Sequence, residues 1–307
     1  MRYTRNLVGL LIFRGNLFME DIKPFKSFKE QLDILKERGL IIDNEDKALK
    51  SLQYINYYRL SGYTLTLRKH DVFYKGITLA NVLELYNFDS ELRVLILYLL
   101  ENIEVSFRTH IAYYHSQKYG SLGYLNCEGF ENKEYHNEFI NGFNSIINSS
   151  ARNSDVFTKH HKSSYGNKFP FWVAVELLTF GNLSRLYSNF QFEIKQKIAI
   201  DNYGIRCEYI QNWLHGLVVL RNICAHRGRL YNRPLSIKPR LSNKDKKLGI
   251  KNNLVFVQIF IIKKLVNDNK VWDNFLTMLD NIIKRYPFVK LSYLGFPENW
   301  YDILKSE

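Results

Sequence analysis

Apolar residues recur at helix spacing over the longest periodic stretch of the chain, residues 89–119. They repeat three, four and seven positions apart, and Gly120 follows the last turn. The pattern is carried by Leu92, Leu95, Ile96, Leu99, Leu100, Ile103, Phe107, Ile111 and Tyr114. Such spacing puts apolar side chains on one face of an α-helix, and that face must be buried against other elements. The stretch therefore predicts a long central amphipathic helix.

Further helices are predicted before and after this one. Ser27 and Glu30 fit a capping box, and Asn44 and Thr78 are N-cap candidates. The predicted helices cover residues 28–38, 45–55, 78–88, 134–147, 170–181, 182–190, 193–203, 205–224, 253–266 and 272–285. Residues 64–67 fit either a short strand or an extended loop. We therefore expect an all-α fold, a helical bundle with additional helices and irregular loops.

The composition is that of a globular protein. A chain of 307 residues that is 46% hydrophobic can bury a substantial core, as one large domain or two small ones. We expect a single helical domain over residues 21–307, preceded by a basic N-terminal extension, residues 1–20, in which Met19 is an alternative start. No apolar run approaches the ~20 residues of a membrane span.

The cysteines favour a reduced, cytoplasmic protein. Cys127, Cys207 and Cys224 have no zinc-site spacing, and their odd number argues against a disulfide framework. The adjacent His160 and His161 are too isolated to form a metal site. We therefore expect neither a metal nor another cofactor.

Arg221 and His226 lie where an apolar, helix-length run turns polar and basic. Five residues correspond to about 140° around a helix and roughly 7.5 Å along it, so both side chains reach one phosphate only through the long Arg side chain or a loosened last turn. Histidine carries a proton near neutral pH, and arginine offers a planar fork to phosphate oxygens. The pair suits phosphodiester cleavage, whereas the alternative is a solvated helix terminus.

A basic tract follows, over residues 221–251. It holds ten Lys or Arg and one acid, Asp245, so it carries +9 of the chain's formal +13. Such a tract suits RNA or DNA, and the alternative is a solvated loop. We favour nucleic acid because the charge adjoins Arg221 and His226. The candidate RNA-binding residues here are Arg227, Arg229, Tyr231, Arg233, Lys238, Arg240, Lys244, Lys246 and Lys247.

Two other segments are candidates for RNA contact or chemistry. The aromatic run that contains Tyr57, Tyr58 and Arg59 permits base stacking, although its composition favours packing of the second helix onto the body. Arg108 lies four residues after Glu104 and seven before His115. An ion pair between Glu104 and Arg108 fits this spacing. We favour a structural role for these three residues, and a secondary site is the alternative.

Several stretches together resemble the Abi-like (abortive infection, AbiD/AbiF-type) family, over roughly residues 25–240. Residues 221–226, RNICAH, also fit the R-x4-H pattern of HEPN ribonucleases, a superfamily of helical RNA-cleaving proteins. The matching stretches are residues 28–43, residues 55–63 (INYYRLSGY), residues 103–109, residues 171–184 and residues 213–233.

The resemblance implies a phage-defence or toxin-like effector with a HEPN-like helical bundle, whose core is residues 78–235. It implies a metal-independent endoribonuclease in which Arg221 and His226 are catalytic and Asn222 orients them. It also implies a homodimer, with the helices at residues 205–224 facing each other. The alternatives are a non-catalytic RNA-binding protein, held with a small RNA or an antitoxin, and a scaffold for another factor.

Overall fold

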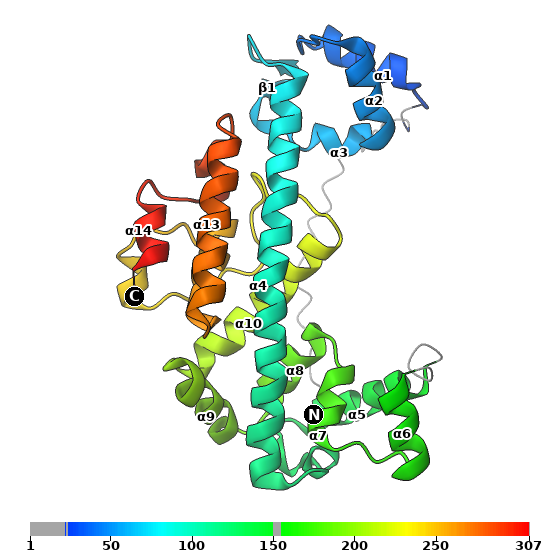
Figure 1. Cartoon of the computed structure of the whole chain (residues 1–307), viewed down its shortest axis with the longest axis vertical. Coiled ribbons are helices and arrows are strands. Elements are labelled where there is room, and N and C mark those ends of the chain that lie inside the picture. Colours follow the sequence, from blue (N-terminus) through cyan, green and yellow to red (C-terminus); the bar gives the residue numbers. More distant parts are fainter. Residues whose placement is uncertain (1–21, 23, 150–154, 307) are drawn as a thin grey trace, which may run out of the picture.

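A single long helix, α4 (Leu79–Tyr119), runs through the molecule (Figure 1). The computed structural model describes residues 22, 24–149 and 155–306, so the expected extension at residues 1–20, with Met19, lies outside the described residues. The sequence predicted two helices, residues 78–88 and 89–119, where the structure has one. No glycine or proline occurs within α4, so nothing interrupts it between the capping box of Thr78 and the terminal Gly120, whose φ is 79°.

The N-terminal elements lie at the beginning of α4 (Figure 1). Residues 64–67, left open between strand and loop, hold a 3-10 turn. A short antiparallel hairpin follows that turn. The elements are α1 (Phe28–Glu37), α2 (Glu45–Tyr54), α3 (Tyr57–Ser61), η1 (Thr64–Thr66), β1 (Arg68–Lys69) and β2 (Val72–Phe73). This group places the aromatic run of α3 beside the first turns of α4.

A second group of short helices lies around the other end of α4 (Figure 1). It comprises η2 (Gly123–Leu125), η3 (Cys127–Gly129), α5 (Lys133–Asn148), α6 (Val156–Ser164), α7 (Phe171–Ala174), η5 (Val175–Leu177) and α8 (Phe180–Asn189). Aromatic side chains fill the space between these helices and α4, among them Phe171 and Phe190, which are fully buried. Part of the aromatic content of the chain, 21 Tyr and 21 Phe, is thus used in core packing.

The C-terminal helices complete the body, and α10 and α13 pack against α4. They are α9 (Phe192–Tyr203), α10 (Cys207–Ala225), α11 (Asn243–Lys246), α12 (Val255–Leu265), α13 (Asn269–Arg285), η6 (Leu291–Leu294) and α14 (Trp300–Lys305). The prediction of an all-α fold is confirmed, since the only paired strands among the described residues are two residues long. None of the described helices is both long and apolar enough to cross a membrane.

Candidate active site at the end of α10

The candidate site lies where α10 ends. Leu217, Leu220 and Cys224 bury one side of the helix. His226 is the first residue beyond the helix, and its backbone N–H still donates to the carbonyl of Asn222 at 3.0 Å. The last turn therefore keeps α-helical hydrogen bonding, and the loosened turn considered from the sequence is not found. Arg221 and His226 leave the helix about 140° apart.

The chain turns sharply after His226. Arg227 adopts the left-handed conformation with φ 55°, and the N–H of Gly228 donates to the carbonyl of Ile223 at 2.7 Å. A Cβ atom on Gly228 would lie 3.0 Å from the Ile223 side chain and 3.1 Å from its carbonyl oxygen. This turn directs the following residues back toward α4.

The candidate catalytic side chains are accessible. Asn222 and His226 are exposed, and Arg221 is half-buried. Within the described part of the chain, no hydrogen bond or ion pair is found for the guanidinium of Arg221 or for the imidazole of His226. Both groups can therefore take up a ligand without first breaking an internal contact.

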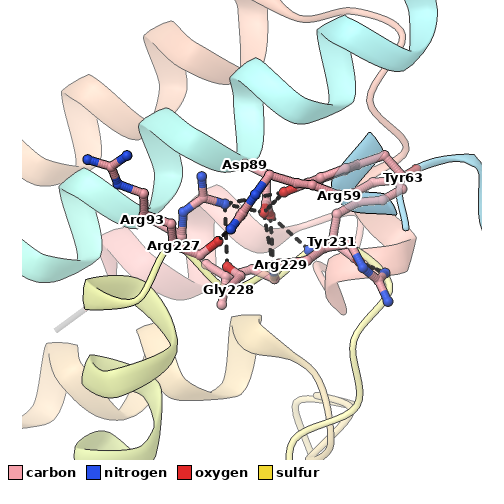
Figure 2. Close-up of polar contacts among 9 residues, drawn as sticks. Arg59, Tyr63, Asp89, Arg93, Arg227, Gly228, Arg229 and Tyr231 are labelled. Carbon is pink, nitrogen blue, oxygen red and sulfur yellow. Dashed lines mark hydrogen bonds and ion pairs between the residues drawn. The ribbon is translucent and has the colours of Figure 1, made fainter. Parts of the chain in front are cut away.

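Asp89 of α4 holds the loop that follows His226 (Figure 2). Its carboxylate is fully buried and accepts hydrogen bonds from the backbone N–H groups of Tyr231, at 2.8 Å, and Leu230, at 3.0 Å. It also accepts from the hydroxyl of Tyr63 at 2.8 Å and from the guanidinium of Arg93 at 2.5 Å. Three parts of the chain that are distant in sequence thus meet at one carboxylate.

The ionised form of Asp89 fits this arrangement. Burial raises the pKa of Asp89, and Arg93 and the donating groups of Leu230, Tyr63 and Tyr231 act in the opposite direction. These four partners all donate to the carboxylate, which matches the acceptor-only chemistry of the charged form. Burial and the neighbouring Asp89 raise the pKa of Tyr63, which therefore remains a neutral donor.

Asp89 was missed from the sequence, although a signal was present. It lies four residues after Leu85 and three before Leu92, so an acid occupies the apolar face of α4. An acid at such a position needs a buried partner. Arg93, one turn later on the same helix, is that partner.

The aromatic run at residues 55–63, the tyrosine-rich segment, supports the same loop. Arg59 donates to the carbonyl of Arg227 at 2.5 Å, and Arg93 reaches the carbonyl of Gly228 at 3.4 Å. Gly62 lies against Arg229. A Cβ atom on Gly62 would be 3.3 Å from the guanidinium Nε of Arg229. Of base stacking and helix packing, the two alternatives for this segment, these contacts favour helix packing. Through that packing the segment supports the loop after α10.

Two of the proposed RNA-binding residues face inward instead. The ring of Tyr231 is 1% exposed, so it has no free face for a base, and this prediction is corrected. Arg229 is half-buried and donates to the carbonyls of Tyr231 and Asn232, the latter at 3.0 Å. Burial lowers the pKa of Arg229. Both residues are drawn in because the chain reverses at Arg227.

The other RNA-binding candidates differ in accessibility. Tyr58 is 86% exposed, whereas Tyr57 is half-buried and accepts from Arg38 at 3.2 Å. Arg59 is exposed but occupied by the carbonyl of Arg227. The basic side chains that remain exposed are Arg227, Arg233, Lys238, Arg240, Lys244, Lys246 and Lys247.

The spacing of Glu104, Arg108 and His115 has a structural basis. Arg108 pairs with Glu104 at 2.6 Å and donates to the carbonyls of Val175, at 3.2 Å, and Leu178, at 3.0 Å. His115 lies elsewhere, fully buried among aromatic rings. The guanidinium and the imidazole therefore have separate surroundings, which favours the structural alternative over a secondary site.

We expect His115 to make folding sensitive to mild acid. Among the described residues its ring nitrogens have no hydrogen-bond partner, and burial, with a smaller contribution from His136, lowers its pKa to about 4. In the unfolded chain the imidazole binds a proton near pH 6.5. The contribution of the neutral His115 to the free energy of unfolding is therefore complete above pH 6.5 and is lost as the pH falls toward 4. Urea unfolding at pH 7 and pH 5 should show a decrease in stability on the order of 1–2 kcal/mol, since one pKa unit is worth about 1.4 kcal/mol.

The matched variant is His115→Leu, which keeps the side-chain volume. Its stability should change less than that of the wild type between the two pH values. An equal change in both proteins would show that other groups cause the acid sensitivity.

A comparison with protein families identifies the chain more closely. A family model described as Abi-like protein matches residues 50–232, more than half of the sequence. The match includes the tyrosine-rich segment, Asp89 and the end of α10. No curated protein and no solved structure matches the chain. The protein belongs to the Abi-like protein family.

Proposed function

We propose that the protein is an AbiD/AbiF-type effector of abortive infection and acts as a metal-independent HEPN endoribonuclease. The observation that carries this proposal is the end of α10, where Arg221 and His226 are accessible and unpaired among the described residues. The buried Asp89 network fixes the loop that follows them. Exposed basic residues lie before and after this loop in the sequence, between residues 227 and 247, and provide positive charge for RNA binding.

In the proposed reaction, His226 moves a proton and Arg221 binds the scissile phosphate. The imidazole takes the proton of the ribose 2′-hydroxyl or gives one to the leaving 5′-oxygen. The guanidinium donates two parallel hydrogen bonds to phosphate oxygens and stabilises their growing charge. Asn222 orients the pair. The products are a 2′,3′-cyclic phosphate and a 5′-hydroxyl, and mass spectrometry of the cleaved ends in EDTA tests this chemistry.

We propose a homodimer in which two α10 helices face each other. Arg221 and His226 leave one helix about 140° apart, so pairing Arg221 of one protomer with His226 of the other brings both groups to one phosphate more easily. We expect light scattering at micromolar concentration to give twice the mass of the chain. A monomer that still cleaves RNA would exclude the paired site.

The basic residues beyond the site are expected to supply much of the affinity for RNA. Lys244, Lys246 and Lys247 are exposed, and replacing all three with Gln should weaken RNA binding regardless of sequence. The plot of log K against log salt should flatten by about 0.7–0.9 for each phosphate that a lysine no longer neutralises. Titrations at several salt concentrations measure this slope. An unchanged slope would identify these lysines as a solvated loop.

A non-catalytic RNA-binding protein is the second candidate, held in complex with a small RNA or an antitoxin. The observation that favours it is the extent of the exposed basic surface, which continues to Lys247, well past Arg221 and His226. Purified protein that binds RNA without cleaving it in EDTA would support this second function. Cleavage would support the first.

A further inference from the structure

A second candidate binding site lies at the opposite end of α10. A cavity of about 700 Å³ opens between the start of α10 and the segment that leads into α11. Its basic lining residues are Arg206, Lys238, Arg240 and Lys246. The 19 residues of α10 span about 28 Å, so this cavity is remote from His226 along the helix.

Two hydrogen bonds with α10 residues hold the wall of this cavity in place. The indole N–H of Trp213 donates to the carbonyl of Arg240 at 2.7 Å, and the N–H of Arg240 donates to the side chain of Asn212 at 2.6 Å. The backbone of Arg240 is therefore fixed against α10, while its guanidinium is exposed. The basic side chains project from an ordered wall, and this separates the cavity from an irregular solvated loop.

The third wall is α11, and its acid does not offset the positive charge of the cavity. Asp245 is buried, accepts from Ser242 at 2.7 Å and pairs with Lys264 at 2.9 Å. Lys246 remains exposed toward the cavity. Four cations and one acid, Glu208, line the site, which leaves a formal charge of +3.

The cavity also has a flat and an apolar part. The guanidinium of Arg206 lies 5.3 Å from the ring centroid of Tyr209, and both line the site. Buried Pro239, Leu241 and Ile250 form the apolar surface. A ligand that fits must combine negative charge with a planar ring of modest polarity. A nucleotide does so, because its phosphates suit the cations and its base suits an aromatic and apolar wall.

We propose that this cavity binds a nucleotide unit, with its phosphates on Lys238, Arg240 and Lys246 and its base against Tyr209. Binding here needs neither Arg221 nor His226, so it is independent of the proposed cleavage. The unit has two sources, a free nucleotide or one residue of an RNA strand. These sources share the same recognition chemistry and differ in the probe that binds.

Calorimetric titration in EDTA with two probes tests the proposal, one being ATP and the other a 5′-phosphorylated 2′-O-methyl trinucleotide. The double variant Lys238→Gln, Arg240→Gln keeps the backbone contacts of Arg240 and should weaken binding about tenfold or more, since it removes charge-assisted hydrogen bonds. The matched control is Lys75→Gln, Lys270→Gln, which removes two exposed cations that lie outside the basic tract and do not line the cavity. It should change binding by less than about threefold, because only screened charge is removed.

A further variant tests the base contact. Tyr209→Leu should weaken ATP binding several-fold and leave binding of inorganic tripolyphosphate unchanged, and thermal melting checks that the variant is folded. The two probes identify the source of the nucleotide. If Lys238→Gln, Arg240→Gln weakens the binding of ATP alone, the ligand is a free nucleotide. If it weakens the binding of the trinucleotide alone, the ligand is a residue of an RNA strand. Weaker binding of both probes supports the shared site. Equal effects of the two double variants, or no binding of either probe at millimolar concentration, would overturn the proposal. His226→Ala should bind both probes like the wild type, so failure of the cleavage mechanism leaves this test intact.

Discussion

Replacing His226 with alanine is expected to abolish RNA cleavage while leaving the fold and most RNA affinity intact. General acid–base catalysis by a side chain contributes roughly 10²–10⁴-fold, and the proposed mechanism has His226 as its proton carrier. The imidazole is exposed and has no internal partner among the described residues, so its removal leaves no buried group unsatisfied. The measurement is the cleavage rate in EDTA, together with the thermal unfolding of both proteins.

The matched control is His215→Ala. His215 is also exposed, but it lies within α10, eleven residues before His226. Its removal should not change the rate. Cleavage that persists in His226→Ala, or that cuts DNA as fast as RNA, would contradict the mechanism, because DNA lacks the attacking 2′-hydroxyl.

Arg221→Lys separates charge from geometry at the same site. Lysine keeps the positive charge but loses the planar fork that binds two phosphate oxygens. The rate of cleavage should therefore fall more than the affinity for RNA. A helix-end arginine with no role in catalysis would instead tolerate lysine in both measurements.

The local patterns of the sequence predicted most of the longer helices and the end of α10, but not α3, α6, α11 and α14, and the helix predicted at residues 170–181 is broken at the extended Leu178. The periodicity of residues 89–119 and the change from apolar to basic residues after Leu220 are both properties of neighbouring residues. The structure confirms the all-α fold and places Arg221 and His226 at the end of a helix. The catalytic roles of these two residues remain a prediction.

The contacts that fix the loop could not be predicted in the same way. Asp89 binds backbone groups 141 and 142 residues away, and a backbone N–H is present at nearly every residue. The sequence therefore shows that an acid on an apolar face needs a partner, but not which loop provides it. The inward positions of Arg229 and Tyr231 were missed for a related reason, since composition alone does not reveal the reversal at Arg227.

Asp89→Asn is expected to cause the largest loss of stability of any change considered. The carboxylate and Arg93 form a buried ion pair, and removing one partner of such a pair costs about 3–5 kcal/mol because a buried charge remains. The amide of asparagine would also place donors near the N–H groups of Leu230 and Tyr231. Urea unfolding measures the loss, and hydrogen exchange of the Leu230 and Tyr231 amides should accelerate.

Glu91→Gln is the control, since Glu91 also belongs to α4, but its pair with Arg285 at 2.8 Å is partly exposed, and the amide oxygen of glutamine can still accept from the hydroxyl of Tyr286, which lies at 2.6 Å. Exposed pairs contribute about 0–1 kcal/mol, so this variant should unfold nearly like the wild type. If Asp89→Asn does not fold, Tyr63→Phe provides a milder test of the same network. This variant removes one hydrogen bond to Asp89 and should lower the free energy of unfolding by about 1 kcal/mol. Equal stability of the Asp89→Asn, Tyr63→Phe and Glu91→Gln proteins would show that the carboxylate does not hold the loop. A destabilisation confined to the Asp89 and Tyr63 variants, with faster exchange at Leu230 and Tyr231, would connect this buried charge to the segment that follows His226.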